Sequence, residues 1–479
     1  MAKHMAKHIA VDLGAESGRI IVGDVRQIEV VYRFGNQPVR IGDSIFWDVL
    51  NIFTEIKRGL KEAFSRYPGE VRSIGLDTWG VDYALLDRQG DMIGSVYHYR
   101  DPRTDGVPDR VFSLIPKREI YEETGIQYMQ INTIHQLYAH VTDKPWLVER
   151  ACSLLTLPDL FHYWLTGLLR SEYSHVTTSQ LYNPRKRDWS WRIIDALGFN
   201  RDWFGEIVAS GTRLGRLLPH VAEEIGATQE VVVVASASHD TACAVAAIPA
   251  SPDSNFAYIS SGTWSLLGIE TPEPIINEKS YTYNFTNEGA ADGGIRFLKN
   301  IIGLWILQEC KRYWDRTDRE YSYAELTDLA REFGPAEFSI DANDPRFLKP
   351  GLIDDGMPDR ILKACRERGQ RQPESPAEIV RGVLQSLARL YAESIEELED
   401  VTGRSVEQLY IIGGGAQNTL LCELTAAAAG IPVFAGPVEA TAIGNILVQA
   451  ISMGEIESIE KGRELIRGSY PIEEFTPDP

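Results

Sequence analysis

The stretch IAVDLGAESGR, residues 9–19, is an apolar run that leads into a tight turn of small and hydroxyl-bearing residues. A second stretch, FAYISSGTWSLL at residues 256–267, has the same construction half a chain later. In each case an apolar run follows the turn, which predicts two β-hairpins. Such turns expose backbone N–H groups, as a polyphosphate ligand requires. Either stretch alone could be an ordinary hairpin, but the two together predict two related domains that contact a nucleotide.

Length and composition describe a globular protein with more than one core. The chain has 479 residues, of which 44% are hydrophobic and 10% aromatic, and this length predicts two domains of ordinary size. The formal net charge of −20 argues against nucleic acid or an anionic membrane surface as a partner. A nucleotide can still bind such a chain through backbone donors and a divalent cation.

Cysteine usage and two short segments bear on the cellular context. The five cysteines are scattered and include no CxxC pair, which favours a reducing cytoplasm. Residues 1–8 repeat the tetrapeptide MAKH and are interpreted as a leader outside the fold. The most membrane-like stretch, residues 424–451, is interrupted by prolines and polar residues. It is not expected to span a bilayer.

Strand-like segments alternate with amphipathic helices, which predicts an α/β fold. The best linker candidate between the two halves is the segment from Pro249 to Ser254. Strands are predicted over 71–76, 83–86, 231–235, 409–412 and 431–435. Helices are predicted over 49–64, 242–247, 301–313, 377–398, 419–429 and 441–452, with a further one begun by residues 154–159.

These segments resemble the FGGY carbohydrate kinases, from about Ile9 to about Ile451. Eleven segments in order carry the resemblance, among them VDLGAESGR, IGLDTWGVDYALLD, ASHDTACAV, YISSGTWSLLG, IIGGGAQNTLL and AGPVEATAIGN. The resemblance implies two actin-like, ribonuclease H-like ATPase lobes with a cleft between them. Residues 9–248 would then bind sugar and phosphate, residues 249–455 would bind adenosine, and residues 456–479 would form a C-terminal tail.

The resemblance also implies a cytoplasmic sugar kinase that uses ATP and Mg²⁺. Within the family, the segments are most similar to members that phosphorylate L-rhamnulose, a 6-deoxyketose, at its C1 hydroxyl in L-rhamnose catabolism. A kinase for another ketose, such as L-fuculose or L-ribulose, is the nearest alternative. A non-enzymatic ATP- or sugar-binding member of the actin-like superfamily is a more distant one. The oligomeric state is left open.

The phosphate-binding roles follow from the same resemblance. Asp12 would orient the water shell of Mg²⁺, because a hard cation prefers oxygen ligands. Arg19 would stabilise the transferring phosphoryl group or, alternatively, pair with a carboxylate. Glu16 is expected to point to solvent, because its charge would repel phosphate. The nucleotide-binding residues implied are Gly14, Ala15, Glu16, Ser17, Gly18, Arg19, Gly262, Thr263, Gln308, Gly413, Gly414, Gly415 and Asn418.

Asp240 is expected to be the catalytic residue. It follows a strand buried on both faces and matches the family's catalytic aspartate, which would accept the proton of the sugar hydroxyl. Phosphoryl transfer depends mainly on alignment and charge neutralisation, so an ordinary aspartate pKa would be adequate. Trp79 could instead be a core aromatic residue, and His239 a structural one. The sugar-binding residues implied are Asp77, Trp79, Gly80, Asp82, His239, Asp240, Thr241 and Asn300.

Overall fold

The computed structural model describes residues 5–228, 230–252, 254–350 and 355–477. The chain divides into two compact units, each assembled from segments that are separate in sequence. The first unit comprises Met1–Pro249, Glu270–Phe297 and Ala440–Ser469. The second comprises Ala250–Ile269, Leu298–Glu439 and Tyr470–Pro479.

The first unit is built on a six-stranded sheet in the order β13-β14-β6-β1-β2-β3. In that order the strands are Thr212–Arg216, Val232–Ala235, Val71–Thr78, Lys7–Leu13, Ser17–Asp24 and Gln27–Gly35. β14, β6 and β1 run parallel, whereas β1, β2 and β3 form an antiparallel meander. The predicted first hairpin is therefore confirmed as β1–β2. Because β1 begins at Lys7, Lys7 and His8 belong to the sheet, although they were expected to lie outside the fold.

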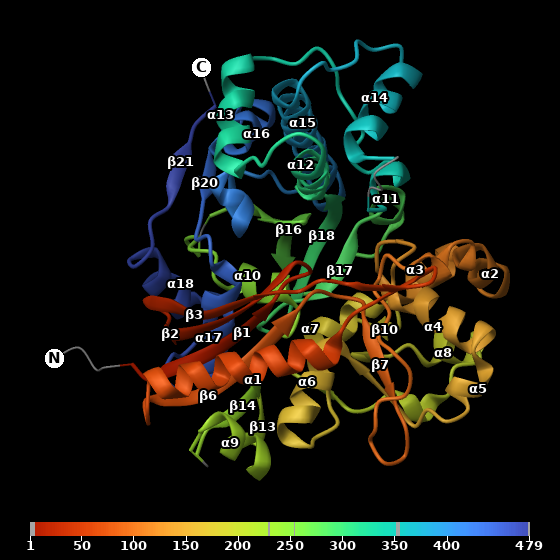
Figure 1. Cartoon of the computed structure of the whole chain (residues 1–479), viewed down its shortest axis with the longest axis vertical. Helices are drawn as coiled ribbons and strands as arrows, with labels where there is room; N and C mark the ends of the chain where they lie inside the picture. The colour runs from red at the N-terminus through yellow and green to blue at the C-terminus, as the bar shows by residue number, and fades with distance from the viewer. Residues whose placement is uncertain (1–4, 229, 253, 351–354, 478–479) are drawn as a thin grey trace. The chain divides into compact units, whose positions relative to one another are not determined.

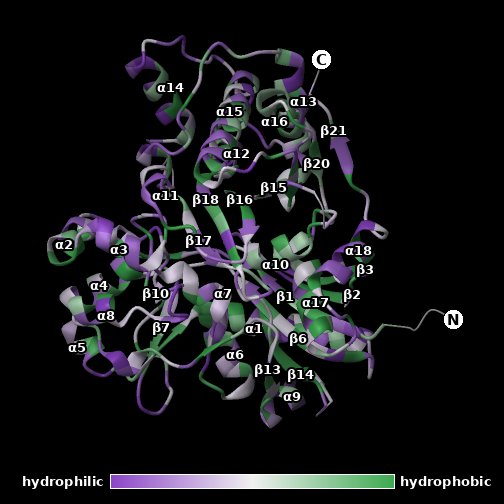
Figure 2. Ribbon diagram, turned by 180° about the vertical axis from the view of Figure 1, so that it is seen from behind, coloured by the Kyte–Doolittle hydropathy of each residue, from purple (hydrophilic) through white to green (hydrophobic). Residues whose placement is uncertain are grey.

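Helices cover both faces of this sheet. One layer holds α1 (Val49–Arg66), α6 (Leu157–Thr166) and α9 (Pro219–Ile225), and the other holds α10 (Asp240–Ala246) and α17 (Ala440–Ser452). Figure 1 shows α1 in front of the strands, and Figure 2, seen from behind, shows the largely hydrophobic α17. Consecutive strand residues point to opposite faces. Ile20 accordingly packs near Gly59 of α1, and Ile21 packs against Ile446 of α17.

The segment between β6 and β14 carries an additional apolar core. Of residues 154–159, which were expected to begin a helix, residues 154–156 belong instead to β8 (Ser153–Thr156), which pairs with β7 (Tyr83–Leu86), and the helix, α6, starts at Leu157. A short apolar run does not distinguish a strand from a helix. The other helices of the first unit are α2 (Val107–Leu114), α3 (Lys117–Thr124), α4 (Thr133–Asp143), α5 (Pro145–Val148), α7 (Tyr173–Val176), α8 (Trp191–Ala196), α11 (Glu278–Thr282) and α18 (Ile459–Arg467).

The second unit holds most of a second sheet, whose neighbouring strands have the order β18-β16-β15-β19-β20-β21. Their bounds are Ile295–Ile302, Trp264–Thr271, Phe256–Ser261, Gln408–Ile412, Val433–Ala435 and Glu473–Phe475. The residues of β18 up to Phe297 and those of β16 from Glu270 onward belong to the first unit. β15 and β16 form the predicted antiparallel hairpin, and β15, β19 and β20 run parallel. The helix expected from residue 301 starts later, because residues 301 and 302 complete β18.

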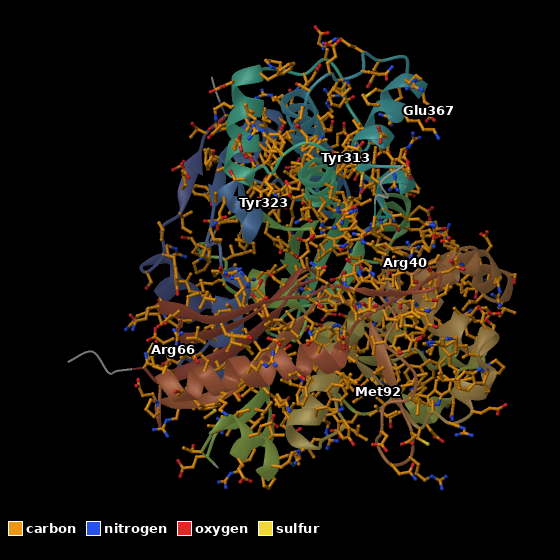
Figure 3. The ribbon with its side chains drawn as sticks, in the orientation of Figure 1. Arg40, Arg66, Met92, Tyr313, Tyr323 and Glu367 are labelled. Carbon is orange, nitrogen blue, oxygen red and sulfur yellow. The ribbon has the colours of Figure 1, made fainter. Side chains whose placement is uncertain are left out.

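The helices of the second unit surround these strands. They are α12 (Trp305–Thr317), α13 (Tyr323–Phe333), α14 (Met357–Glu367), α15 (Pro376–Thr402) and α16 (Thr419–Ala429). Tyr313 of α12, labelled in Figure 3, packs closely on Gly356 at the start of α14. Within the described ranges, no helix combines the length and the apolar character needed to cross a bilayer.

Candidate active site

Three carboxylates of the first unit meet at one edge of its sheet. Asp12 and Asp77 are register partners on the parallel strands β1 and β6. Asp240 begins α10 beyond β14, and the neighbouring His239 forms a parallel bridge with Thr78 at the end of β6. Burial, followed by the charges of Asp12 and Asp240, raises the pKa of Asp77 well above its usual value. The carboxyl edge of parallel strands is where α/β proteins bind ligands.

Asp240 is the most accessible of these carboxylates. Its side chain is 30% exposed, whereas Asp77 is fully buried. The backbone N–H and the hydroxyl of Thr241 donate to Asp240 Oδ1 at 2.5 and 3.1 Å, which fixes the carboxylate. Burial and then the charge of Asp12 raise the pKa of Asp240 to about 7, above the ordinary value assumed from the sequence. A group that titrates near neutral pH is well matched to accepting a proton.

Arg296 is a site residue that sequence reasoning missed. It is fully buried at the start of β18. Its Nη2 donates to His239 Nδ1 at 2.9 Å and to Glu288 Oε2 at 3.3 Å. The available signal was an arginine inside the apolar segment IRFL at residues 295–298. Charged side chains are rarely buried unless they are paired, so this pattern could have indicated a buried ion pair.

Arg296 determines the protonation pattern of His239. A guanidinium group can only donate hydrogen bonds, so His239 Nδ1 must accept and the proton lies on Nε2. Burial first, and then the charge of Arg296, lowers the pKa of His239 well below its usual value. The ring is therefore neutral at physiological pH. Its Nε2 lies 3.5 Å from Asp240 Oδ1, so the Nε2–H is beside the accessible carboxylate.

The Trp79–Asp82 segment contains a strained turn. Val81 has a φ of 70°, in the left-handed region that β-branched residues avoid. Asp82 N–H donates to the Gly80 carbonyl across it, at 3.0 Å. The Val81 N–H donates to the Thr178 hydroxyl at 3.1 Å. Strain that the surroundings hold in place is found preferentially at functional sites.

Asp82 is fully buried and holds Trp79 in place. Its Oδ2 accepts from the indole N–H groups of Trp47 and Trp79 at 2.6 and 2.9 Å, and its Oδ1 accepts from Gln136 at 3.1 Å. Burial raises the pKa of Asp82 to about 6 in spite of these donors. The rings of Trp47 and Trp79 lie 4.2 Å apart. The geometry therefore gives Asp82 the task of orienting Trp79.

The first glycine turn is closed by its own hydrogen bonds. Gly14 N–H donates to the Ser17 carbonyl at 2.9 Å, and Asn36 Nδ2 donates to the Gly14 carbonyl at 3.0 Å. At Gly18, a Cβ would lie 2.2 Å from the Phe34 ring, so a larger residue would require this ring to move. Because the Gly14 N–H donates to the Ser17 carbonyl, it is not available as a donor to a ligand.

The other residues of this turn are arranged around an ion pair. Arg19 Nη2 lies 2.5 Å from Asp12 Oδ2, and the two residues are register partners across the hairpin. Of the two roles considered for Arg19, this contact corresponds to the second, an ion pair with a carboxylate. Ala15 and Ser17 are half-buried, and Glu16 is exposed, as its charge led us to expect.

In the second unit, the two remaining glycine turns pack against each other. A Cβ on Gly415 would lie 1.9 Å from Ser261 Oγ. A Cβ on Gly413, whose φ is 81°, would lie 3.1 Å from the Ser261 carbonyl. A Cβ on Gly414 would meet nothing within 4 Å. Packing therefore explains Gly413 and Gly415, and Gly414 is the member of the triplet that leaves space for a ligand.

The Gly262–Thr263 turn is tied to the start of α12. Gly262 N–H donates to the Trp264 carbonyl at 2.8 Å. The carbonyls of Gly262 and Thr263 accept from the N–H groups of Leu304 and Trp305, at 3.0 and 3.2 Å. The turn thus orients the first residues of α12, the helix that carries Gln308.

The three polar candidates of the second unit differ in their surroundings. Gln308 has a buried side-chain oxygen with no hydrogen-bond partner in the described part of the chain. Asn418 has a structural task, because its Oδ1 accepts from Leu421 N–H at 2.9 Å and caps α16. Asn300 is half-buried on β18. Of the three, Gln308 has the clearest unused polar atom.

Known proteins are similar to nearly the whole chain. Models of the N-terminal and C-terminal domains of the FGGY family of carbohydrate kinases match residues 8–247 and 257–453. A rhamnulokinase from Halalkalibacterium halodurans is 44% identical over 471 residues, which cover 98% of both chains. A rhamnulokinase from Bacteroides thetaiotaomicron is 41% identical over 473 residues, which cover 98% of this chain and 95% of the relative.

Solved structures share the fold. A ligand-bound xylulose kinase from Lactobacillus acidophilus gives a TM-score of 0.80 at 13% identity, covering 98% of this chain and 94% of that one. A Plasmodium falciparum glycerol kinase with ADP gives 0.77 at 14% identity, covering 99% and 95%. These likenesses show a two-domain α/β fold, as predicted. The two domain models and the relatives above 40% identity establish that the chain belongs to the FGGY family of carbohydrate kinases.

Proposed function

We propose that this chain transfers the γ-phosphate of ATP to the C1 hydroxyl of L-rhamnulose, giving L-rhamnulose 1-phosphate and ADP. The observation that carries the proposal is the Asp240 carboxylate, which is accessible, held by Thr241 and raised in pKa to about 7. Relatives named rhamnulokinase, at 40 to 44% identity, support the choice of sugar. L-Fuculose and L-ribulose are the nearest alternative substrates.

Asp240 would accept the proton of the attacking hydroxyl. Thr241 occupies Oδ1, so Oδ2 is the oxygen available to the sugar. The Nε2–H of His239 would donate to a sugar oxygen beside it, and Trp79 would offer an apolar edge to the deoxysugar. Gly80 would allow close approach of the sugar, and Asn300 would contribute a further polar contact.

The strand-end carboxylates fit Mg²⁺. Asp77 Oδ1 is buried and lacks a hydrogen-bond partner in the described structure, and oxygen is the donor that Mg²⁺ prefers. Within the described residues, no three His, Cys, Asp or Glu side chains form a metal-binding group. Asp12 would therefore orient the water molecules that surround Mg²⁺. For this its ion pair with Arg19 would first have to open. Bound Mg²⁺ would neutralise charge on the phosphates.

Each unit would contribute nucleotide contacts of its own. Residues 9–248 would supply sugar and phosphate contacts through the β1–β2 turn, and residues 249–455 would supply adenosine contacts. In the second unit, Gly414 offers open space and Gln308 offers an unused oxygen. Gly413 and Gly415 would shape the turn without touching the ligand, and Thr263 would donate its hydroxyl to a phosphate.

The test is an ADP-release assay with L-rhamnulose, L-fuculose and L-ribulose, with ³¹P NMR to locate the phosphoester. We expect L-rhamnulose to have the highest kcat/KM and the phosphate to appear at C1. Asp240→Asn should lose about 10²- to 10⁴-fold in kcat, the usual contribution of a general base. Asp328→Asn, at an exposed position on α13, should leave kcat unchanged. A preference for a pentulose would overturn the choice of sugar, and a nearly active Asp240→Asn would overturn the choice of base.

A further inference from the structure

A chain of buried polar side chains in the first unit ends at Asp77. It consists of His8, Ser73, Gln449, Asn445 and Asp77, and each of these residues is fully buried. Two of them lie on α17 and the other three on β1 and β6. Burying polar groups costs free energy unless they are hydrogen-bonded. A fully connected chain of this length therefore indicates a specific task.

The hydrogen bonds that link these five side chains run toward Asp77. Asn445 Nδ2 donates to Asp77 Oδ2 at 2.6 Å, and Gln449 Nε2 donates to Asn445 Oδ1 at 2.7 Å. Ser73 Oγ donates to Gln449 Oε1 at 2.6 Å. Because the Ser73 hydroxyl donates its single proton to Gln449, its oxygen accepts a hydrogen bond from His8 Nδ1 at 2.8 Å. Successive hydrogen bonds polarise one another, which strengthens the last donor, the one on the carboxylate.

β6 is shaped to receive the two amides. A Cβ on Gly75 would lie 2.3 Å from Asn445 Oδ1 and 2.7 Å from Gln449 Nε2. Gln449 Nε2 also donates to the Ile9 carbonyl at 2.9 Å. Gly75 therefore occupies the position on β6 that lies against the side-chain amides of Asn445 and Gln449 on α17. Both amide groups are fixed in orientation by contacts on more than one side.

We propose that Asn445 and Gln449 are positioning residues for the Asp77 carboxylate. Asn445 holds Oδ2, which leaves Oδ1 for a sugar hydroxyl or a metal-bound water, and Oδ1 has no partner within the described residues. A neutral amide does not accept a proton on its nitrogen, so the chain is a scaffold and not a proton relay. The inference rests on the proposed kinase function for its activity readout.

The first experiment measures kcat, KM and thermal unfolding in Asn445→Ala, Gln449→Met and Ser73→Ala. We expect kcat to fall about tenfold or more in Asn445→Ala, the effect of losing a hydrogen bond to a charged group. The loss should shrink with distance from Asp77, from Asn445 to Gln449 to Ser73. The matched control is Ile446→Val on the same helix, which packs on Ala10 and Ile21. It should lower the Tm and leave kcat unchanged.

A double-mutant cycle separates positioning from general structure. In an Asp77→Asn background, Asn445→Ala should change kcat less than twofold, because the group it positions is already altered. An equal fold-loss in both backgrounds, or an Asn445→Ala enzyme with the kcat of the unmodified chain, would overturn the inference. If Asn445→Ala does not fold, the same double-mutant cycle with Gln449→Met in its place tests the inference.

A crystal structure of Gln449→Met gives a readout that does not depend on activity. We expect the Asp77 carboxylate to rotate away from its present position, and an unmoved Asp77 would overturn the inference. If the unmodified chain phosphorylates none of the ketoses, the proposed function fails, whereas the crystallographic result still decides the positioning role. The two failures are therefore distinguishable.

Discussion

Arg296 Nη2 lies 2.9 Å from His239 Nδ1, and this contact places the imidazole proton on Nε2, beside Asp240. His239, the N-cap of α10, and Asp240, its first residue, are thereby set in complementary states, a neutral donor and a carboxylate acceptor. The carboxylate is held by Thr241 and the imidazole by Arg296. A substrate hydroxyl between them would meet a fixed pattern of one donor and one acceptor.

Replacing Arg296 should move the proton on His239. In Arg296→Met with Glu288→Gln, the donor to Nδ1 and the neighbouring carboxylate are both altered, so the Nδ1–H tautomer becomes accessible. We expect ¹⁵N NMR of the imidazole to show a gain of Nδ1–H and kcat/KM to fall about 10- to 100-fold, as expected for a lost hydrogen bond near charged groups. An unchanged Nε2–H signal would contradict the tautomer assignment.

Asp82 should make the folded protein less stable as the pH rises from about 4 to 6. Its folded-state pKa is about 6, above the value of about 3.9 for an unfolded aspartate. Between these values the folded chain holds a proton that the unfolded chain has released, so raising the pH favours unfolding. The full effect is about 3 kcal/mol, from two pH units at roughly 1.4 kcal/mol each.

The comparison of the unmodified chain with Asp82→Asn isolates this contribution. Other carboxylates titrate in both proteins and cancel in the difference. The free energy of unfolding of the unmodified chain minus that of Asp82→Asn should fall by about 3 kcal/mol in all between about pH 3 and 7, with about 2 kcal/mol of this lost between pH 4 and 6, and should level off above pH 7. Urea denaturation at constant ionic strength measures it. A difference that stays constant or rises would show that Asp82 titrates normally.

The sequence predicted the features that local pattern determines. Both glycine hairpins, the buried strand leading to Asp240 and the helix after the glycine triplet are found where they were expected. Each is marked by an apolar run interrupted by glycine or by polar residues, a signal confined to neighbouring positions. Residues 154–156 were wrongly expected to begin a helix, because strand pairing with β7 decides their conformation.

The features that were missed depend on partners far away in sequence. Arg296 reaches His239 across 57 positions, and Asn445 reaches Asp77 across 368. No local pattern distinguishes Asp82, which orients a tryptophan, from a carboxylate that faces a ligand. The raised pKa of Asp240 likewise arises from burial and from Asp12 on another strand. Side-chain roles of this kind follow from packing and not from spacing along the chain.

The glycine triplet offers a test that separates packing from ligand binding. A methyl group at Gly415 would collide with Ser261 Oγ at 1.9 Å, whereas one at Gly414 would meet nothing within 4 Å. We expect Gly415→Ala to lower the stability of the chain by about 2 kcal/mol or more, as overpacking does. We expect Gly414→Ala to leave the Tm unchanged and to weaken ADP binding about tenfold, because the methyl group occupies the space proposed for the nucleotide.

Differential scanning calorimetry and isothermal titration with ADP measure the two effects on the same samples. Gly415→Ala combined with Ser261→Gly removes the colliding side chain, so it should recover part of the lost Tm. A Gly414→Ala chain that binds ADP as tightly as the unmodified one would place the adenosine elsewhere. A Gly415→Ala chain with unchanged Tm would show that the two turns separate easily, because their contact would then contribute little to the stability of the second unit.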